Sequence, residues 1–121
     1  MSGTRSKTKL ITKDYWWRFL QRTVAPGNTR DVRFRRSQRY PLQGELKLTV
    51  DGHEEMGFWS LALLEVSLEG LSAKASYDIP VDREVIIELN PDAAHIVMKG
   101  RVIHCTQTIG GYKVGIELIF D

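Results

Sequence analysis

Apolar and polar residues alternate in short runs from residue 42 onward, which is the pattern of strands with one buried face. Residues typical of turns separate these runs, among them Asp51-Gly52 and Asn90-Pro91-Asp92. The last two runs are joined across 106–111 and form a predicted hairpin. The predicted strands lie at 42–50, 56–66, 70–75, 84–89, 95–105 and 112–120. Short strands with close turns predict a mainly β domain, built as an antiparallel barrel or sandwich.

Residues 12–24 follow a helical period instead. Thr12 or Asp14 can cap the start of this predicted helix, and Ala25-Pro26-Gly27 ends it. Its apolar side chains cover an arc of about 200°; they are Tyr15, Trp16, Trp17, Phe19, Leu20 and Val24. Such an arc needs burial against its own domain, a partner chain or an anionic membrane surface. Tyr15, Trp16, Phe19 and Leu20 are therefore candidate contacts for an effector protein, and the same face would suit a homodimer.

Composition places the chain among cytoplasmic globular proteins. It has 121 residues, 42% hydrophobic and 26% charged, which suits one folded domain. No apolar run is long enough to span a membrane, and the basic N-terminus lacks the apolar core of a signal peptide. The single cysteine, Cys105, excludes an internal disulfide and suggests a reducing compartment.

Charge is divided unevenly along the chain. Residues 1–47 hold 12 basic and 3 acidic residues, a net charge of +9, whereas residues 48–121 hold 5 basic and 12 acidic residues, a net charge of −7. A basic first half predicts an anionic partner, which could be a nucleotide, a nucleic acid or an acidic lipid surface.

Enzymatic function has little support in the sequence. His53, His95 and His104 are not at metal-ligand spacing, and Cys105 has no base near it in sequence, so a small core residue is its simplest interpretation. Glycine-rich phosphate loops of the Gly-x-Gly-x-x-Gly or Walker type are also missing from the sequence. We therefore expect a binding protein, not an enzyme.

The first candidate motif is Arg35-Arg36-Ser37-Gln38-Arg39, in the arginine-rich connector 26–41. Arginine offers a planar fork of donors that binds phosphate in two places and stacks on bases. Arg35 and Arg39 could converge on one ligand if the connector curls around it. The alternative is a solvated basic loop.

The second candidate motif is Glu65-Val66-Ser67-Leu68-Glu69-Gly70, at the end of a predicted strand. A carboxylate can accept the N–H donors of a guanine edge, and a hydroxyl can bind phosphate or the turn itself. Glycine permits close approach of a ligand and a positive φ. The alternative is a tight turn in which Ser67 bonds its own backbone.

Taken together, the two motifs resemble those of the PilZ domain family. The family has Arg-x-x-x-Arg before the first barrel strand and Asp/Asn-x-Ser-x-x-Gly later. Arg35 and Arg39 match the first pattern, and Ser67 and Gly70 match the second, with Glu65 at the usual Asp or Asn position. The final segment, GRVIHCTQTIGGYKVGIELIF, is similar to the closing hairpin of the family. The resemblance covers about residues 30–120.

The resemblance implies a six-stranded antiparallel PilZ-type β-barrel that binds the bacterial second messenger cyclic di-GMP, with no further cofactor. It implies a basic tail and aromatic helix over 1–29 and the barrel domain with its arginine loop over 30–121. The implied ligand-binding residues are Arg35, Arg36, Arg39, Glu65, Ser67 and Gly70. We expect Glu65 to weaken binding without abolishing it, and the arginine loop to close over the barrel and relay the signal to a partner protein.

Two other functions remain open. One is a PilZ-like interaction module that does not bind the nucleotide and uses the aromatic helix. The other is a barrel that binds single-stranded nucleic acid, which would need aromatic residues on a strand face beside basic ones. The aromatic residues cluster in the predicted helix and the strand-rich half is acidic, so we expect no nucleic-acid partner.

Overall fold

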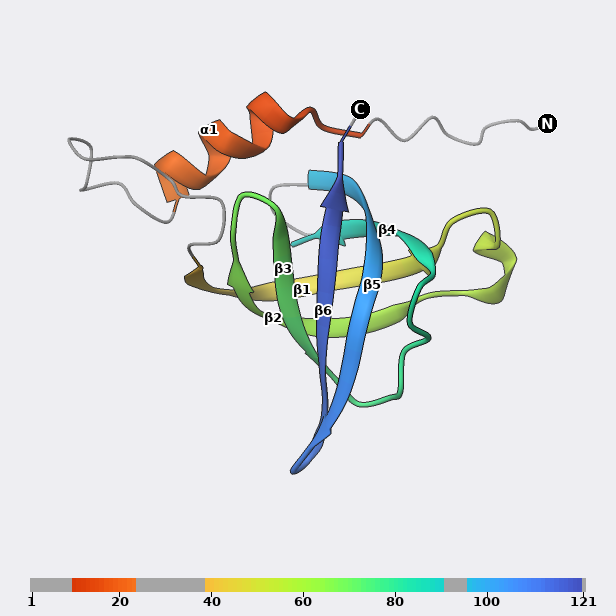
Figure 1. Ribbon diagram of the computed structural model, residues 1–121. Coiled ribbons are helices and arrows are strands. Elements are labelled where there is room, and N and C mark those ends of the chain that lie inside the picture. The colour runs from red at the N-terminus through yellow and green to blue at the C-terminus, as the bar shows by residue number, and fades with distance from the viewer. Residues whose placement is uncertain (1–9, 24–38, 91–95, 121) are drawn as a thin grey trace.

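The fold is a closed six-stranded antiparallel barrel with one helix at its N-terminal side (Figure 1). The computed structural model describes residues 10–23, 39–90 and 96–120. The elements are α1 (Lys13–Thr23), β1 (Tyr40–Val50), β2 (Trp59–Val66), β3 (Gly70–Ala75), β4 (Glu84–Leu89), β5 (Ile96–Thr108) and β6 (Gly111–Ile119). The mainly β class, the barrel and the N-terminal helix predicted from the sequence are confirmed. The predicted boundary between residues 29 and 30 lies outside the described residues.

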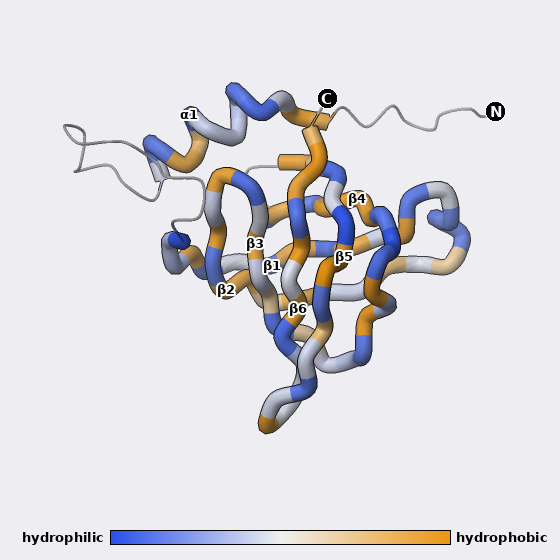
Figure 2. The backbone as a smooth tube through the Cα atoms, in the orientation of Figure 1, coloured by the Kyte–Doolittle hydropathy of each residue, from blue (hydrophilic) through white to orange (hydrophobic). Residues whose placement is uncertain are grey.

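The strands are ordered β1-β2-β3-β6-β5-β4, and β1 also pairs with β4 to close the sheet. Every second residue is buried in β4 and in β1 from Leu46 onward, as the sequence pattern requires. Figure 2 shows the hydropathy of each position along the strands. The inward-facing side chains form one apolar core that includes Leu48, Val85, Ile87, Met98 and Ile116. Burial of this continuous face is the main force that selects the barrel.

The connection between β1 and β2 is longer than predicted. A turn at Asp51-Gly52 is followed by a short 3-10 helix over Glu54–Met56, and β2 begins only at Trp59. The predicted strand start at residue 56 is therefore wrong. Met56 and Phe58 are 68% and 55% exposed, so burial does not hold this stretch in a strand.

The hairpin between β5 and β6 is tighter than predicted. Strand pairing continues as far as Thr108 and Gly111, so the turn is only Ile109-Gly110 and not 106–111. Gly110 has a φ of 90°, a conformation that glycine adopts without steric cost. The paired polar residues of this hairpin project beyond the core (Figure 1).

Helix α1 packs on its own barrel. Thr12 caps it, because its Oγ1 accepts a hydrogen bond from the Tyr15 N–H at 3.1 Å. Trp16 and Leu20 are completely buried and belong to the barrel core. The prediction that both could contact an effector protein is therefore wrong for this docked helix, because neither side chain reaches the surface. Tyr15 is 48% exposed and Phe19 is half-buried, so only these two of the four keep accessible surface.

Candidate ligand-binding site

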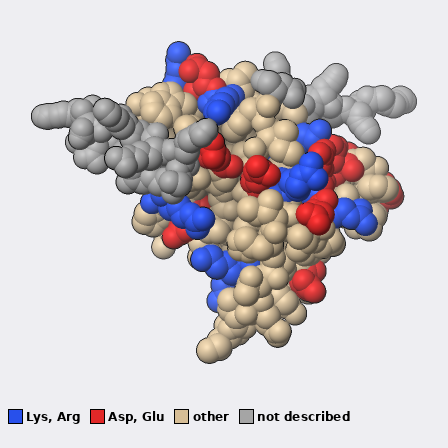
Figure 3. All heavy atoms as spheres, in the orientation of Figure 1, with Lys and Arg blue, Asp and Glu red and all other residues tan. Residues whose placement is uncertain are grey.

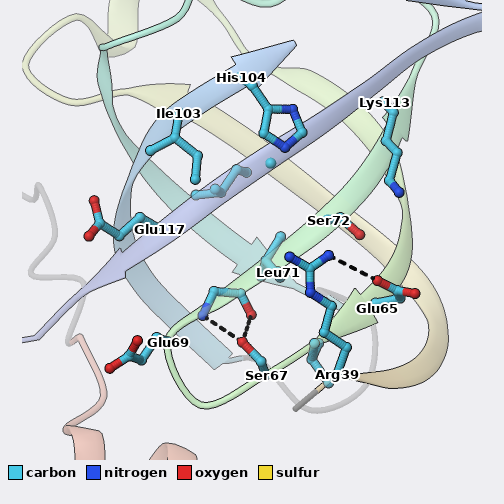
Figure 4. A pocket seen from close by; sticks show the side chains of 14 residues that line it. Arg39, Glu65, Ser67, Glu69, Leu71, Ser72, Ile103, His104, Lys113 and Glu117 are labelled. Carbon is cyan, nitrogen blue, oxygen red and sulfur yellow. Dashed lines mark hydrogen bonds and ion pairs between the residues drawn. The ribbon is translucent and has the colours of Figure 1, made fainter. Parts of the chain in front are cut away.

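A pocket of about 490 Å³ lies on the outer face of β3, β6 and β5 (Figure 4). Arg39, Glu65, Ser67 and Gly70 all line it, so the structure brings together the described members of both sequence motifs. Arg35 and Arg36 lie outside the described residues. The two motifs are far apart in sequence, and strand pairing is what places them in one pocket.

Arg39 reaches the pocket because it comes directly before β1. The start of β1 pairs with the end of β2, through Tyr40 with Val66 and Pro41 with Glu65. Arg39 Nη1 then lies 3.4 Å from Glu65 Oε1, and the two side chains are 62% and 38% exposed. An ion pair with this exposure contributes little to folding stability, so Arg39 can change partners at low cost.

Ser67 and Gly70 form a closed turn between β2 and β3. The Ser67 N–H donates to the Gly70 carbonyl at 2.8 Å. The Ser67 hydroxyl donates to the same carbonyl at 3.2 Å and accepts from the Gly70 N–H at 3.0 Å. The hydroxyl therefore bonds the backbone of its own turn, which was the alternative to direct ligand contact.

Gly70 has a steric role in the fold beside the ligand approach predicted for it, and it lacks the positive φ predicted for it. It is the first residue of β3 and does not adopt a positive φ. A Cβ at this position would lie 2.7 Å from the Ile116 carbonyl oxygen on the neighbouring strand. The absence of a side chain therefore permits the close approach of β3 and β6 beneath the pocket.

Four residues form a row across the pocket, and only one of them, Glu65, belongs to a sequence motif. Glu65 pairs with Ser72, Ser72 with Gly115, and Gly115 with His104. Directly paired residues share one face of a sheet, so the row crosses β2, β3, β6 and β5 on the outer side. Irregular pairing near Glu65 and near His104 bends the two outer strands of this row.

Ser72 and His104 are two of the pocket residues that the sequence interpretation missed, and Lys113 and Glu117 are two others. Ser72 is 4% exposed, and its hydroxyl has no hydrogen-bond partner within the described part of the chain. The His104 imidazole lies over Gly115, where a Cβ would overlap its Nε2 atom. The sequence indicated only an ordinary strand residue at His104, because the contact between His104 and Gly115 depends on the register between β5 and β6.

The charge around the pocket is mixed. Arg39 and Lys113 are its basic residues, whereas Glu65, Glu69 and Glu117 are acidic. Figure 3 shows basic and acidic side chains side by side on the face formed by β3, β6 and β5. The described lining therefore has no excess of positive charge with which to hold a multiply charged anion.

The other sequence candidates provide no reactive group. Burial raises the pKa of the Cys105 thiol, and its Sγ accepts a hydrogen bond from the Ile79 N–H at 3.3 Å. Cys105 is therefore a partly buried packing residue and not an activated thiolate. No group of histidine, cysteine and carboxylate side chains that could hold a metal ion occurs within 10–23, 39–90 and 96–120. In the same ranges, α1 is too short and too polar to cross a bilayer.

The family model for the PilZ domain matches residues 33–120. The chain belongs to the PilZ domain family. Its fold is also similar to a crystal structure described as the PilZ domain of CeSA from a cellulose-synthesizing bacterium. That match has a TM-score of 0.54 and 18% sequence identity, and covers 70% of this chain and 83% of the other. No curated protein matches the chain.

Membership of the PilZ family defines the general class of function. The matched segment contains both motifs that the sequence shares with the family, the first of which begins at Arg35. The family is one of cyclic di-GMP receptors, whose domains act as binding and adaptor modules and not as enzymes.

Proposed function

We propose that this protein is a cyclic di-GMP receptor that changes the conformation of its arginine loop on binding and relays the signal to a partner protein. The observation that supports this most strongly is the meeting of Arg39 with the turn Ser67–Gly70 in one pocket. Cyclic di-GMP offers phosphates to arginine and guanine edges to a carboxylate, and both groups line this pocket.

The proposed roles follow from the contacts in the ligand-free site. Arg39 exchanges the Glu65 carboxylate for a phosphate or for the O6/N7 edge of guanine, which arginine binds in bidentate fashion. Glu65, once released, accepts hydrogen bonds from guanine N1–H and N2–H. Ser67 stabilises the turn between β2 and β3, because its hydroxyl is already hydrogen-bonded to Gly70. The buried Ser72 hydroxyl has donor capacity to offer a ligand that enters beside it.

Arg35 and Arg36 have a specific part in this proposal. The described lining contains more acidic than basic residues, so a ligand with two phosphates needs further positive charge. Arg35 and Arg36 precede Arg39 closely enough in sequence to supply it. Closing of the 30–39 segment over the ligand is then the conformational change that a partner protein detects. We place this activity in the cytoplasm.

The alternative is a PilZ module that does not bind the nucleotide. Two contacts favour it: Arg39 already pairs with Glu65, and the Ser67 hydroxyl already bonds to Gly70. A site whose polar side chains already have partners within the protein could serve only as a scaffold. In that case the accessible side chains Tyr15 and Phe19 of α1 remain candidate contacts for a partner protein.

Calorimetric titration of the full chain with cyclic di-GMP, GTP and a single-stranded oligonucleotide distinguishes these functions. We expect saturable heat of binding, with a Kd in the micromolar range, for cyclic di-GMP alone. The same heat with GTP would contradict specificity for the cyclic dinucleotide, and heat with the oligonucleotide would favour nucleic-acid binding. A lack of heat with all three ligands would reject the receptor function and leave the interaction module.

A further inference from the structure

One hydrogen bond joins helix α1 directly to the turn that lines the pocket. The indole Nε1–H of Trp16 donates to the Ser67 carbonyl oxygen at 3.0 Å, and this contact is buried. Ser67 is itself bonded to Gly70 through its N–H and its hydroxyl. Three groups of Ser67 are therefore engaged, and one of their partners lies on a different element of the fold.

The indole is held firmly enough to position the turn. Trp16 is completely buried, and its ring is stacked on Phe19 with centroids 5.5 Å apart. Leu20, one helical turn further on, is also completely buried. Ahead of the helix, the Ile11 N–H donates to the Val97 carbonyl of β5 at 2.9 Å. These contacts fix α1 across the end of the barrel that carries the β2–β3 turn (Figure 1).

Removing the indole would leave the Ser67 carbonyl buried without this partner. An unsatisfied buried carbonyl is unfavourable, so the turn would move to expose it or to find another donor. Because Ser67 and Gly70 both line the pocket, such a movement changes the shape of the pocket.

We infer that Trp16 is a positioning residue for the pocket, and that docking of α1 on the barrel is thermodynamically coupled to ligand binding. The ligand part of this inference rests on the proposed function. The helix holds the Ser67–Gly70 turn in its binding geometry. By reciprocity, a ligand that prefers this geometry stabilises the docked helix by the same factor. The helix is thereby part of the receptor and responds to the ligand without touching it.

The test compares Trp16→Phe with Trp59→Phe. The first variant keeps a six-membered aromatic ring in the core and removes the N–H donor together with the second ring of the indole. The second makes the same change at the opposite end of β2, in a side chain that does not line the pocket. We expect the Kd for cyclic di-GMP to rise roughly 5- to 50-fold in Trp16→Phe and to stay within about twofold in Trp59→Phe.

Hydrogen exchange of the ligand-free protein provides a readout that needs no ligand. In Trp16→Phe we expect the amides of 67–72 to exchange roughly tenfold faster, while those of β4 and β5 keep their protection. In the wild-type protein, saturating cyclic di-GMP should slow exchange in α1. Unchanged exchange at 67–72 together with an unchanged Kd would overturn the inference.

The two proposals can fail separately. If the wild-type protein binds no cyclic di-GMP, the proposed function fails, and exchange at 67–72 in the ligand-free variants still decides the positioning role. If Trp16→Phe does not fold, Leu20→Ala takes its place, because it loosens α1 and keeps the indole. Faster exchange at 67–72 in Leu20→Ala supports the coupling, and wild-type exchange there rejects it.

Discussion

Two groups of charged side chains on the barrel differ in the ion pairs that their basic residues form. On the β4–β5 side, Lys99 lies 3.3 Å from Asp51 and 3.5 Å from Glu84, and Arg101 lies 3.1 Å from Glu84. At the pocket, Arg39 has one carboxylate partner within the described part of the chain, Glu65, at 3.4 Å. The first group joins β4, β5 and the end of β1, whereas the second joins one residue before the barrel to the end of β2.

This difference separates a structural role from the proposed binding role. Arg101 and Glu84 are also direct register partners, so their contact forms together with the strand pairing. Arg39 does not belong to a strand, and its exposed guanidinium can leave Glu65 without disturbing the sheet. A basic side chain with a weak partner beside a pocket is suited to binding an anion from solution.

The largest effect is expected on ligand affinity when one arginine of each group is replaced by alanine. Arg39→Ala should weaken cyclic di-GMP binding by ~2–4 kcal/mol, roughly 30- to 1000-fold, because charge-assisted hydrogen bonds to the ligand are lost. Its free energy of unfolding should change by less than about 0.5 kcal/mol. The matched control, Arg101→Ala, should cost at most about 1 kcal/mol of stability and leave the affinity unchanged. Calorimetry and urea unfolding of both variants measure the contrast, and equal affinity losses would refute it.

The next effect tests the backbone beneath the pocket. Gly70→Ala places a Cβ against the Ile116 carbonyl, so β3 and β6 must separate, at a cost of about 1–3 kcal/mol in unfolding free energy. We expect the affinity for cyclic di-GMP to fall as well. Gly52→Ala is the comparison, because Gly52 has a φ of 84° but no atom within 4 Å of the added Cβ. That variant should lose stability without losing affinity, and an unaltered affinity in Gly70→Ala would contradict the role of close packing here.

A smaller effect concerns the length of the acidic side chain. Glu65→Asp restores a residue typical of the family motif and withdraws the carboxylate from Arg39. Because the exposed ion pair must break before Arg39 binds a ligand, weakening it should tighten cyclic di-GMP binding by up to about 5-fold. A titration of this variant beside the wild-type protein measures the change. Weaker binding by the aspartate variant would show that the longer side chain is itself adapted to the ligand.

The smallest effect lies in the pH dependence of the structural group. Hydrogen bonding and the negative charge of Asp51, followed by the charge of Glu84, raise the pKa of Lys99. A raised folded-state pKa means that Lys99 contributes stability below the pKa of an unfolded lysine and loses this contribution as the pH rises through the folded value. The difference in unfolding free energy between wild type and Lys99→Met should therefore shrink on going from pH 9 to strongly alkaline pH. A difference that stays constant over this range would argue against the charge interaction.

Most of the barrel could be predicted from the sequence because its determinants are local. Alternation in 70–75 and 84–89 gives the bounds of β3 and β4 as the structure has them. The start of β2 and the end of β5 could not be predicted in the same way. The stretch before Trp59 has apolar residues that remain exposed, and β5 continues through polar residues that are held by pairing with β6.

The site could be predicted only in part, because some of its determinants are local in sequence and others depend on neighbouring strands. Arg39 belongs to one linear motif, and Glu65, Ser67 and Gly70 belong to a second, so their residue types could be recognised in order. The steric need for Gly70 and the contact between His104 and Gly115 depend on neighbouring strands, which no linear spacing specifies. The burial of Trp16 and Leu20 likewise depends on where α1 packs, and its amphipathic pattern is equally compatible with burial against another protein.

The pairing of β1 with β4 limits how this protein can bind a partner protein. Residues Leu46–Val50 bond to Val85–Leu89, so the described sheet is a complete ring. Where this pairing closes the ring, the described sheet has no unpaired strand to which an incoming peptide could add a further one. Along this closed part of the barrel, recognition by a partner therefore relies on side chains, on the loops at the barrel ends or on the outer face of α1.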